Sequence, residues 1–433
     1  MEGKTEQGLV DQPAGESQRE FLFPAFILLF LSALFYTHQY FFRVLPGTMQ
    51  EDLIKDFKLS DFELGNVAAC FFYAYLIVQP LSGIVIAKTS NAFALLIASI
   101  AVLLGALVMS MASASVHLYT SQLLLGVGGS FALIIALNAG RAAVSQKFYP
   151  LFSGGVVAVG ASGAILGQAP LSYISEIFDW QRIVFYSALL EVVIIVSMLW
   201  LLALNRGLHR SPRLAKKACD RKPGLWETLT DSNVWLLSAM GLFLCLPLAS
   251  FVIVWLYPFI SLELGKDTVF SRLAPTMAYG GYVVGSPVVG WLATSMPARK
   301  PQMLMAASGI GLVTSLLAIY TTEHSIIVVY GLLFLMGVCI SCITIIISLV
   351  RDWIPSERLP IALGIAMCAL NLGGTLSLIA IGYILDLEKA IVTVPQLEAY
   401  HVALVFVPSS FAIAIVIAGL IQLRARRRHA AIC

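Results

Sequence analysis

Long apolar runs separated by short polar segments make up most of the chain. About 20 apolar residues suffice to cross the hydrocarbon core of a bilayer as a helix, because each helical residue rises about 1.5 Å. Such runs predict spans near residues 22–46, 61–86, 91–112, 115–142, 148–173, 182–204, 233–261, 272–294, 302–322, 325–351, 360–385 and 399–423. The pattern therefore predicts an all-α polytopic membrane protein with twelve transmembrane helices.

Composition supports this class. Of the 433 residues, 59% are hydrophobic and 12% are charged, whereas a soluble domain has about 25% charged residues. The first twenty residues are polar and lack the basic region of a secretory signal peptide, so we expect the first helix to be retained.

Basic residues are distributed asymmetrically between the predicted loops. With Arg43 placed inside a span, the basic residues expected outside are Lys55, Lys58, Arg182, Lys266, Arg272 and Lys389, and the other twenty of the 27 lie on the opposite side. Because cytoplasmic loops carry the excess of Lys and Arg, both chain termini are expected in the cytoplasm.

The chain divides into two similar halves. Gly83 and Gly290 follow corresponding spans at an offset of 207 residues (290 − 83), and Pro150 and Pro355 recur at an offset of 205 (355 − 150). These repeats predict two pseudo-symmetric six-helix bundles. The expected segments are a tail (1–21), the N-terminal bundle (22–204), a basic linker (205–231), the C-terminal bundle (232–423) and a basic tail (424–433).

One face of the first span is polar. At 100° per residue, an arc of about 100° contains Ser32, Tyr36, Gln39, Tyr40, Arg43 and Gly47. An ionised side chain facing lipid costs about 2.5–3.5 kcal/mol, so the arc is expected to face protein or water. Because Arg43 lies nine residues beyond Leu34, about 13 Å from the middle of the span, snorkelling to the interface is the alternative.

Other spans contribute polar and aromatic side chains to the expected cavity. The substrate-binding candidates are Tyr36, Gln39, Tyr40, Arg43, Gln168, Tyr257, Tyr279, Tyr282 and Asn371. Glu191 is the only carboxylate deep within a predicted span and is the candidate for proton coupling, with a structural, hydrogen-bonded carboxyl as the alternative. His38 points about 140° away from Arg43 and is expected to be packed or interfacial.

The organisation resembles the major facilitator superfamily along essentially the whole chain. The loop after the second span keeps Gly83 and Lys88 of the family's conserved loop motif but has Ala87 at the acidic position. Glycines at 126–129 and 160–167 are interpreted as helix-packing residues. The resemblance implies a transporter with its substrate site between the two bundles.

The first span also resembles the Y-x-D-R-x stretch of the organic anion:cation symporters in that superfamily. Tyr40 and Arg43 match, while Phe42 replaces the acid and Gly129 stands where a second carboxylate is expected on the fourth span. The resemblance implies anion recognition by Arg43, but it does not carry over the proton-linked acidic pair. The planar fork of arginine suits carboxylate or phosphate.

Enzymatic and metal chemistry have little support. Cys339 and Cys342 form a C-x-x-C on one span without a second pair, which favours small residues at a helix contact over a metal site. No histidine–carboxylate cluster, nucleophilic triad or phosphate loop is recognisable. We expect no enzyme activity, no cofactor, no metal and no nucleic-acid partner.

The leading hypothesis is a secondary active transporter that takes up a small polar solute, an amino acid or other organic anion being favoured, with proton linkage as an open option. Export of a drug or siderophore is the alternative transporter hypothesis. A receptor or scaffold that keeps the fold without transport is the alternative from another class. The expected location is a bacterial inner membrane, with membrane lipids around a functional monomer.

Overall fold

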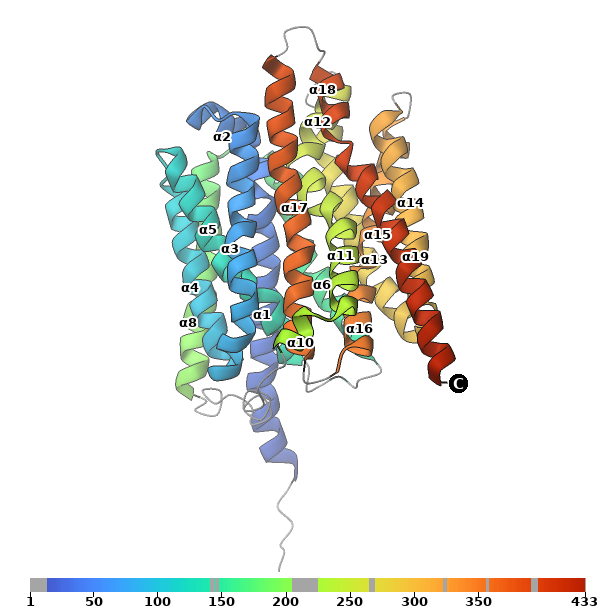
Figure 1. Cartoon of the computed structure of the whole chain (residues 1–433). Coiled ribbons are helices and arrows are strands. Elements are labelled where there is room, and N and C mark those ends of the chain that lie inside the picture. The colour runs from blue at the N-terminus through green and yellow to red at the C-terminus, as the bar shows by residue number, and fades with distance from the viewer. Residues whose placement is uncertain are drawn as a thin grey trace, which may run out of the picture.

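The computed structural model describes residues 14–140, 144, 148–204, 225–264, 269–321, 325–355, 358–390 and 396–432. Every regular element in these residues is a helix. The long helices run side by side, and α1 begins at the same end of the molecule at which α19 finishes (Figure 1). We call this the terminal end, and we call the opposite end, where α2, α12 and α18 lie, the distal end.

The first half contains eight helices in the described residues. They are α1 (Ala14–Thr48), α2 (Gln50–Phe57), α3 (Asp61–Lys88), α4 (Asn91–Ser110), α5 (Ser115–Gly140), α6 (Tyr149–Leu166), α7 (Ala169–Ile174) and α8 (Trp180–Leu204). The first eight residues of α1 fall in the segment predicted as a tail, and residues 1–13 of that tail lie outside the described residues.

The second half begins with α10 and ends with α19. Its elements are α10 (Leu225–Leu229), α11 (Ser232–Pro247), the π-helix η3 (Leu248–Trp255), α12 (Leu256–Glu263), α13 (Val269–Ser295), the 3₁₀-helix η4 (Pro297–Arg299), α14 (Lys300–Tyr320), α15 (Ile326–Ile340), α16 (Ile343–Trp353), α17 (Leu359–Ala390), α18 (Gln396–Ala403) and α19 (Phe406–Ile432). Residues 205–224 of the predicted linker lie outside the described residues.

Each of the twelve predicted spans coincides with one helix or with two or three consecutive helices. By length and hydropathy, eleven segments of the described chain qualify as membrane spans, and α13 is the one predicted span that does not. Although α13 is 27 residues long, it contains Arg272, Pro275 and Pro287, which lower its hydropathy. Because α13 packs along α6 and α15, these residues lie within the helix assembly. The all-α, twelve-span prediction is confirmed.

Four predicted spans, 148–173, 233–261, 325–351 and 399–423, are interrupted where the backbone departs from a regular α-helix. Two of these interruptions lie next to a proline. The span predicted at 148–173 breaks at Gly167 and Gln168, before the proline in the first turn of α7. The span predicted at 233–261 passes through η3, which follows Pro247. Proline lacks the N–H that a helix interior requires, so breaks of this kind are expected next to it.

Glycines on α6 allow α1 to pack directly on its backbone. A Cβ atom at Gly163 would lie 1.7 Å from the carbonyl oxygen of Thr37, and one at Gly160 would lie 2.3 Å from the ring of Tyr36. The Thr37 hydroxyl also donates a 2.9 Å hydrogen bond to the carbonyl of Val159. The glycines at 160–167 therefore act as packing residues, as the sequence indicates.

The two halves touch most extensively along two helix pairs, α3 with α17 and α6 with α13. In Figure 1, α17 stands beside α3. Backbones approach closely at both contacts: a Cβ at Gly382 would lie 2.6 Å from the carbonyl oxygen of Asp61, and one at Gly154 would lie 2.4 Å from that of Ser286. Small residues thus let helices of different halves approach each other.

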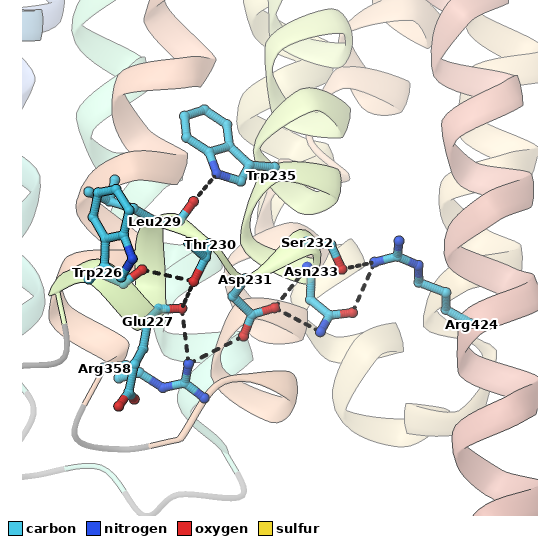
Figure 2. Close-up of polar contacts among 10 residues, drawn as sticks. All are labelled: Trp226, Glu227, Leu229, Thr230, Asp231, Ser232, Asn233, Trp235, Arg358 and Arg424. Atoms are coloured by element: carbon cyan, nitrogen blue, oxygen red, sulfur yellow. Dashed lines mark hydrogen bonds and ion pairs between the residues drawn. The ribbon is translucent and has the colours of Figure 1, made fainter.

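At the terminal end, polar contacts join α10, α11, α19 and the residue just before α17 (Figure 2). Asp231 caps α11 by accepting a 2.9 Å hydrogen bond from the N–H of Asn233, and its other carboxylate oxygen lies 3.6 Å from the guanidinium of Arg358. Arg424 of α19 donates to the Ser232 hydroxyl at 3.1 Å. These contacts fix the start of the second half against its last helix.

Candidate functional site

The Arg43 side chain lies among four aromatic rings inside the first half. Its guanidinium carbon is 4.6 Å from the centre of the Tyr40 ring, 5.2 Å from that of Phe71, 5.4 Å from that of Phe72 and 5.5 Å from that of Tyr75. Tyr40 comes from α1 and the other three rings from α3. Ring faces attract a cation, and more strongly where water is excluded. The guanidinium therefore faces protein and does not snorkel.

Arg43 has no carboxylate partner among the described residues. Its Nε atom is buried and makes no hydrogen bond. A buried charge is normally paired, because removing it from water costs several kcal/mol. The site thus presents a positive charge and a free donor without a matching anion from the described chain.

Tyr40 extends this aromatic cluster to the second half. Its ring centre lies 5.3 Å from that of Tyr36 on α1 and 6.5 Å from that of Tyr279 on α13, both in edge-to-face geometry. Tyr282, one turn further along α13, is also buried. Four of the predicted site residues are therefore brought together: Tyr36, Tyr40, Arg43 and Tyr279.

Gln39 occupies the space that Gly129 leaves free. A Cβ atom at position 129 would lie 2.7 Å from Oε1 of Gln39 and 2.8 Å from the ring of Phe71. Gln39 is buried, and neither atom of its amide has a hydrogen-bond partner. At the position where the resemblance expects a carboxylate on the fourth span, this chain instead accommodates a neutral amide with free donors and acceptors.

Gln168 and Tyr257 lie at a second site, nearer the distal end. They line a cavity of about 240 Å³ between the halves, together with Gly47, Glu51, Asp52, Glu176 and Arg272. Gln168 is buried, and its amide has no hydrogen-bond partner. Burial, followed by the nearby carboxylates of Asp56 and Glu51, raises the pKa of Asp52 above its ordinary value.

Contacts across this cavity hold the halves together. The Tyr257 hydroxyl donates a 2.9 Å hydrogen bond to Glu51, and Arg272 forms an ion pair with Glu176. Gly47, four residues beyond Arg43 on the same face of α1, packs on η3, where a Cβ would lie 1.8 Å from the carbonyl oxygen of Ile253. The cavity therefore adjoins the Arg43 face of α1 where α1 and η3 touch.

The Asn371 side chain forms its hydrogen bond within its own helix, α17. Its amide donates a 2.8 Å hydrogen bond to the carbonyl of Met367, one turn earlier on α17. Asn371 is buried. The structure records no contact between Asn371 and the aromatic cluster around Arg43.

His38 and Glu191 form a buried pair. Nδ1 of His38 lies 2.7 Å from Oε1 of Glu191, and the two side chains are 5% and 0% exposed. The sequence analysis did not foresee this pair, because α1 and α8 bring together residues 153 positions apart. On the helical wheel of α1, His38 points away from Arg43. The residue that it contacts on its own side of α1 is Glu191.

The α3 aromatics around Arg43 were missed by the sequence analysis. Phe71, Phe72 and Tyr75 belong to the run FFYAY at 71–75, which resembles any apolar stretch of a membrane helix. The available signal was the density of rings in one turn and a half of helix. Only the packing of α3 against α1 shows that these rings surround a charge.

Comparison with known families agrees with this architecture. The family model described as Major Facilitator Superfamily matches residues 25–271 and 239–431. No curated protein matches the chain significantly. The matched family consists of membrane transporters, which bind small-molecule substrates, and not of enzymes. Because the matches extend over nearly the whole length, the chain belongs to the Major Facilitator Superfamily.

Proposed function

We propose that the protein is a secondary active transporter that takes up a small organic anion, amino acids being favoured, by alternating access. The observation that carries the proposal is Arg43, whose guanidinium lies among four aromatic rings, has a buried Nε and has no carboxylate partner among the described residues. An incoming carboxylate would supply the missing charge and accept two parallel hydrogen bonds from the guanidinium.

The surroundings of Arg43 favour a small polar solute. Hydroxyl groups of Tyr36, Tyr40 and Tyr279 and the free amide of Gln39 offer hydrogen bonds beside the charge. The adjoining cavity of about 240 Å³ is below the roughly 300 Å³ at which pockets for drug-sized ligands begin. A bulky drug or siderophore would need more space than this conformation provides.

Alternating access is supported by the kinds of contact between the halves. At the distal end these contacts include single polar pairs, such as Tyr257 with Glu51 and Arg272 with Glu176. Pairs of this kind can separate and re-form at modest cost because water can solvate the parted groups. Separation of the halves at the distal end would open the cavity next to the Arg43 face of α1 to that side of the membrane.

Three further parts of the proposal rest on the sequence. The terminal end is assigned to the cytoplasm of a bacterial inner membrane from the distribution of basic residues. The lipid-embedded monomer is taken as the functional unit. Coupling to protons is assigned to Glu191, the carboxylate deep in a span.

Binding by the purified protein provides the test. Amino acids, sugar acids, nucleosides and siderophores are screened for thermal stabilisation, since a ligand stabilises the folded state by mass action. Arg43→Lys keeps the charge without the fork, and Arg43→Gln removes both. A lost charge-assisted contact of about 1.5–3 kcal/mol corresponds to about ten- to hundredfold weaker binding, with Arg43→Lys in between.

Arg182→Gln is the matched control, because Arg182 and its partner Asp179 are both 68% exposed. It should bind every hit as the unmodified protein does. Undiminished binding of anionic hits by well-folded Arg43→Gln would refute the anion site. If hits bind but no flux appears in proteoliposomes, the receptor hypothesis replaces the transporter.

A further inference from the structure

The His38–Glu191 pair is buried in the middle of the first half. Glu191 is the twelfth residue of the 25-residue helix α8, and His38 lies ten residues before the end of α1. The imidazole ring lies 4.6 Å from the Phe42 ring and 5.8 Å from the Phe41 ring, centre to centre. Aromatic rings favour a protonated imidazole, while the carboxylate supplies its counter-charge.

Few other titratable groups surround the pair. Helix α4, which packs on both α1 and α8, has no charged residue, histidine, tyrosine or cysteine. Helix α5 carries His117 and Tyr119 near its start, and α6 carries Tyr149 at its first position. Helix α3 has Cys70, Tyr73 and Tyr75 within its span and Asp61, Glu63 and Lys88 near its ends. The short helix α7 has Tyr173, and η3 has no titratable residue. The titratable residues of α2 are Glu51, Asp52, Lys55 and Asp56. On the pair's own helices lie Tyr36, Tyr40 and Arg43 of α1 and Arg182 and Tyr186 of α8.

The pair can hold a variable number of protons. A neutral imidazole already carries one N–H. If the pair holds one further proton, shared between the imidazole and the carboxyl, its net charge is zero. A second such proton makes the net charge +1 and can reside on Oε2 of Glu191 while Nδ1–H of His38 still donates to Oε1. Both Oε2 of Glu191 and Nε2 of His38 are buried without a hydrogen-bond partner. Each of these two atoms can therefore carry a proton without breaking an existing hydrogen bond.

Arg43 follows His38 by five residues on α1, about 8 Å along a helix. The two side chains point to different sides of α1, so their charges are farther apart than this rise along the axis. A second proton on the pair would still add a positive charge to an interior of low dielectric constant that already holds the Arg43 charge, which opposes its uptake. An anion bound to Arg43 removes that opposition. The helix α1 therefore links the two sites electrostatically without requiring any change of backbone.

We propose that His38 and Glu191 together form the proton-carrying site of this transporter, and that anion binding at Arg43 promotes uptake of a second proton by the pair. This inference rests on the proposed anion transport. In each cycle one proton would be taken from water on the side where the anion binds and returned to water where the anion leaves. By linkage, the proton would increase anion affinity by the same factor by which the anion increases proton uptake.

Infrared titration of the purified protein tests the pair without any transported solute. A protonated carboxyl group deep in the protein gives a carbonyl band separate from those of carboxylates, and this band should appear as the pH falls and be lost in Glu191→Gln. In Arg43→Gln, which imitates the anion-neutralised site, the band should persist to higher pH than in the unmodified protein. Arg182→Gln, the exposed control, should leave it unchanged.

The results separate this inference from the proposed function. A band that survives in Glu191→Gln, or that shows no titration between pH 4 and 9, would make the pair a fixed structural contact. A band that titrates identically with and without Arg43 would refute the link between the sites. If Glu191→Gln fails to fold, the comparison of Arg43→Gln with the unmodified protein still decides, because both keep the pair. Anion binding to Arg43 is tested by the separate screen.

Discussion

Asp386 of α17 accepts a hydrogen bond from the backbone N–H of Phe62 at 2.9 Å, in the first turn of α3. Its second carboxylate oxygen accepts from the N–H of Asp61 at 3.0 Å. A residue of the second half therefore satisfies the free N–H groups at the start of a helix in the first half, where the helix dipole also favours a negative charge. Lys389, one turn later, forms an ion pair with Asp61.

Replacing Asp386 by alanine should weaken closure at the distal end. Loss of two charge-assisted, half-buried hydrogen bonds corresponds to about 1–2 kcal/mol, or about a five- to thirtyfold change in the ratio of closed to open molecules. Spin labels at positions 55 and 398, on opposite halves, would report a larger population of long distances. Glu388→Ala on the same helix serves as the control, and equal distance distributions for the two variants would rule out this role for Asp386.

Much of the fold follows from local pattern, and so does part of the site. The polar stripe of Tyr36, Tyr40 and Arg43 is encoded within two turns of one helix, so its common face can be derived from the period of 3.6 residues. The position of Gln168 could not be derived in this way, because the break at Gly167 moves it from the predicted regular span to the distal cavity.

Contacts between residues that are distant in the chain could not be derived from the sequence, for a different reason. Glu191 and His38 lie on helices that hydropathy alone cannot place next to each other, and their separation of 153 residues carries no periodic signal. The same holds for Asp386 and Phe62, whose contact depends on how the two halves face each other. Charged residues at helix ends look alike in sequence, whether they meet water or another helix.

Close packing of α1 on α6 predicts different effects for two glycines of α6. Gly163→Ala places a Cβ 1.7 Å from the Thr37 carbonyl oxygen, so the backbones must separate. We expect a loss of about 1–3 kcal/mol, as for other overpacked interiors, measured as a lower Tm in detergent. Gly155→Ala is the matched control because a Cβ there meets nothing within 4 Å. Equal Tm values for the two variants would contradict this account of the α1–α6 contact.

Asp52 should make stability depend on pH in a defined direction. Burial and the neighbouring Asp56 and Glu51 raise its pKa in the folded protein, so folding favours the protonated carboxyl. The contribution is favourable below the unfolded value of about 3.9 and is lost as the pH rises through the folded pKa. Asp52→Asn should therefore increase Tm at pH 7, with a gain that shrinks as the pH falls towards 4. A gain of equal size at both pH values would exclude titration of Asp52 as its cause.

The ring of Tyr40 should contribute to the anion site through its effect on Arg43. It is the nearest of the four rings to the guanidinium, at 4.6 Å, and it also contacts Tyr279 of the second half. Tyr40→Phe keeps the ring and removes only the hydroxyl, whereas Tyr40→Leu removes the ring. A desolvated cation–π contact is worth about 2 kcal/mol, so Tyr40→Leu should weaken binding of an anionic screening hit by about thirtyfold. Tyr40→Phe should stay within a few fold of the unmodified protein unless its hydroxyl contacts the ligand. Isothermal titration calorimetry distinguishes the cases: equally weak binding by both variants would assign the effect to the hydroxyl, and undiminished binding by Tyr40→Leu would show that the ring does not position Arg43.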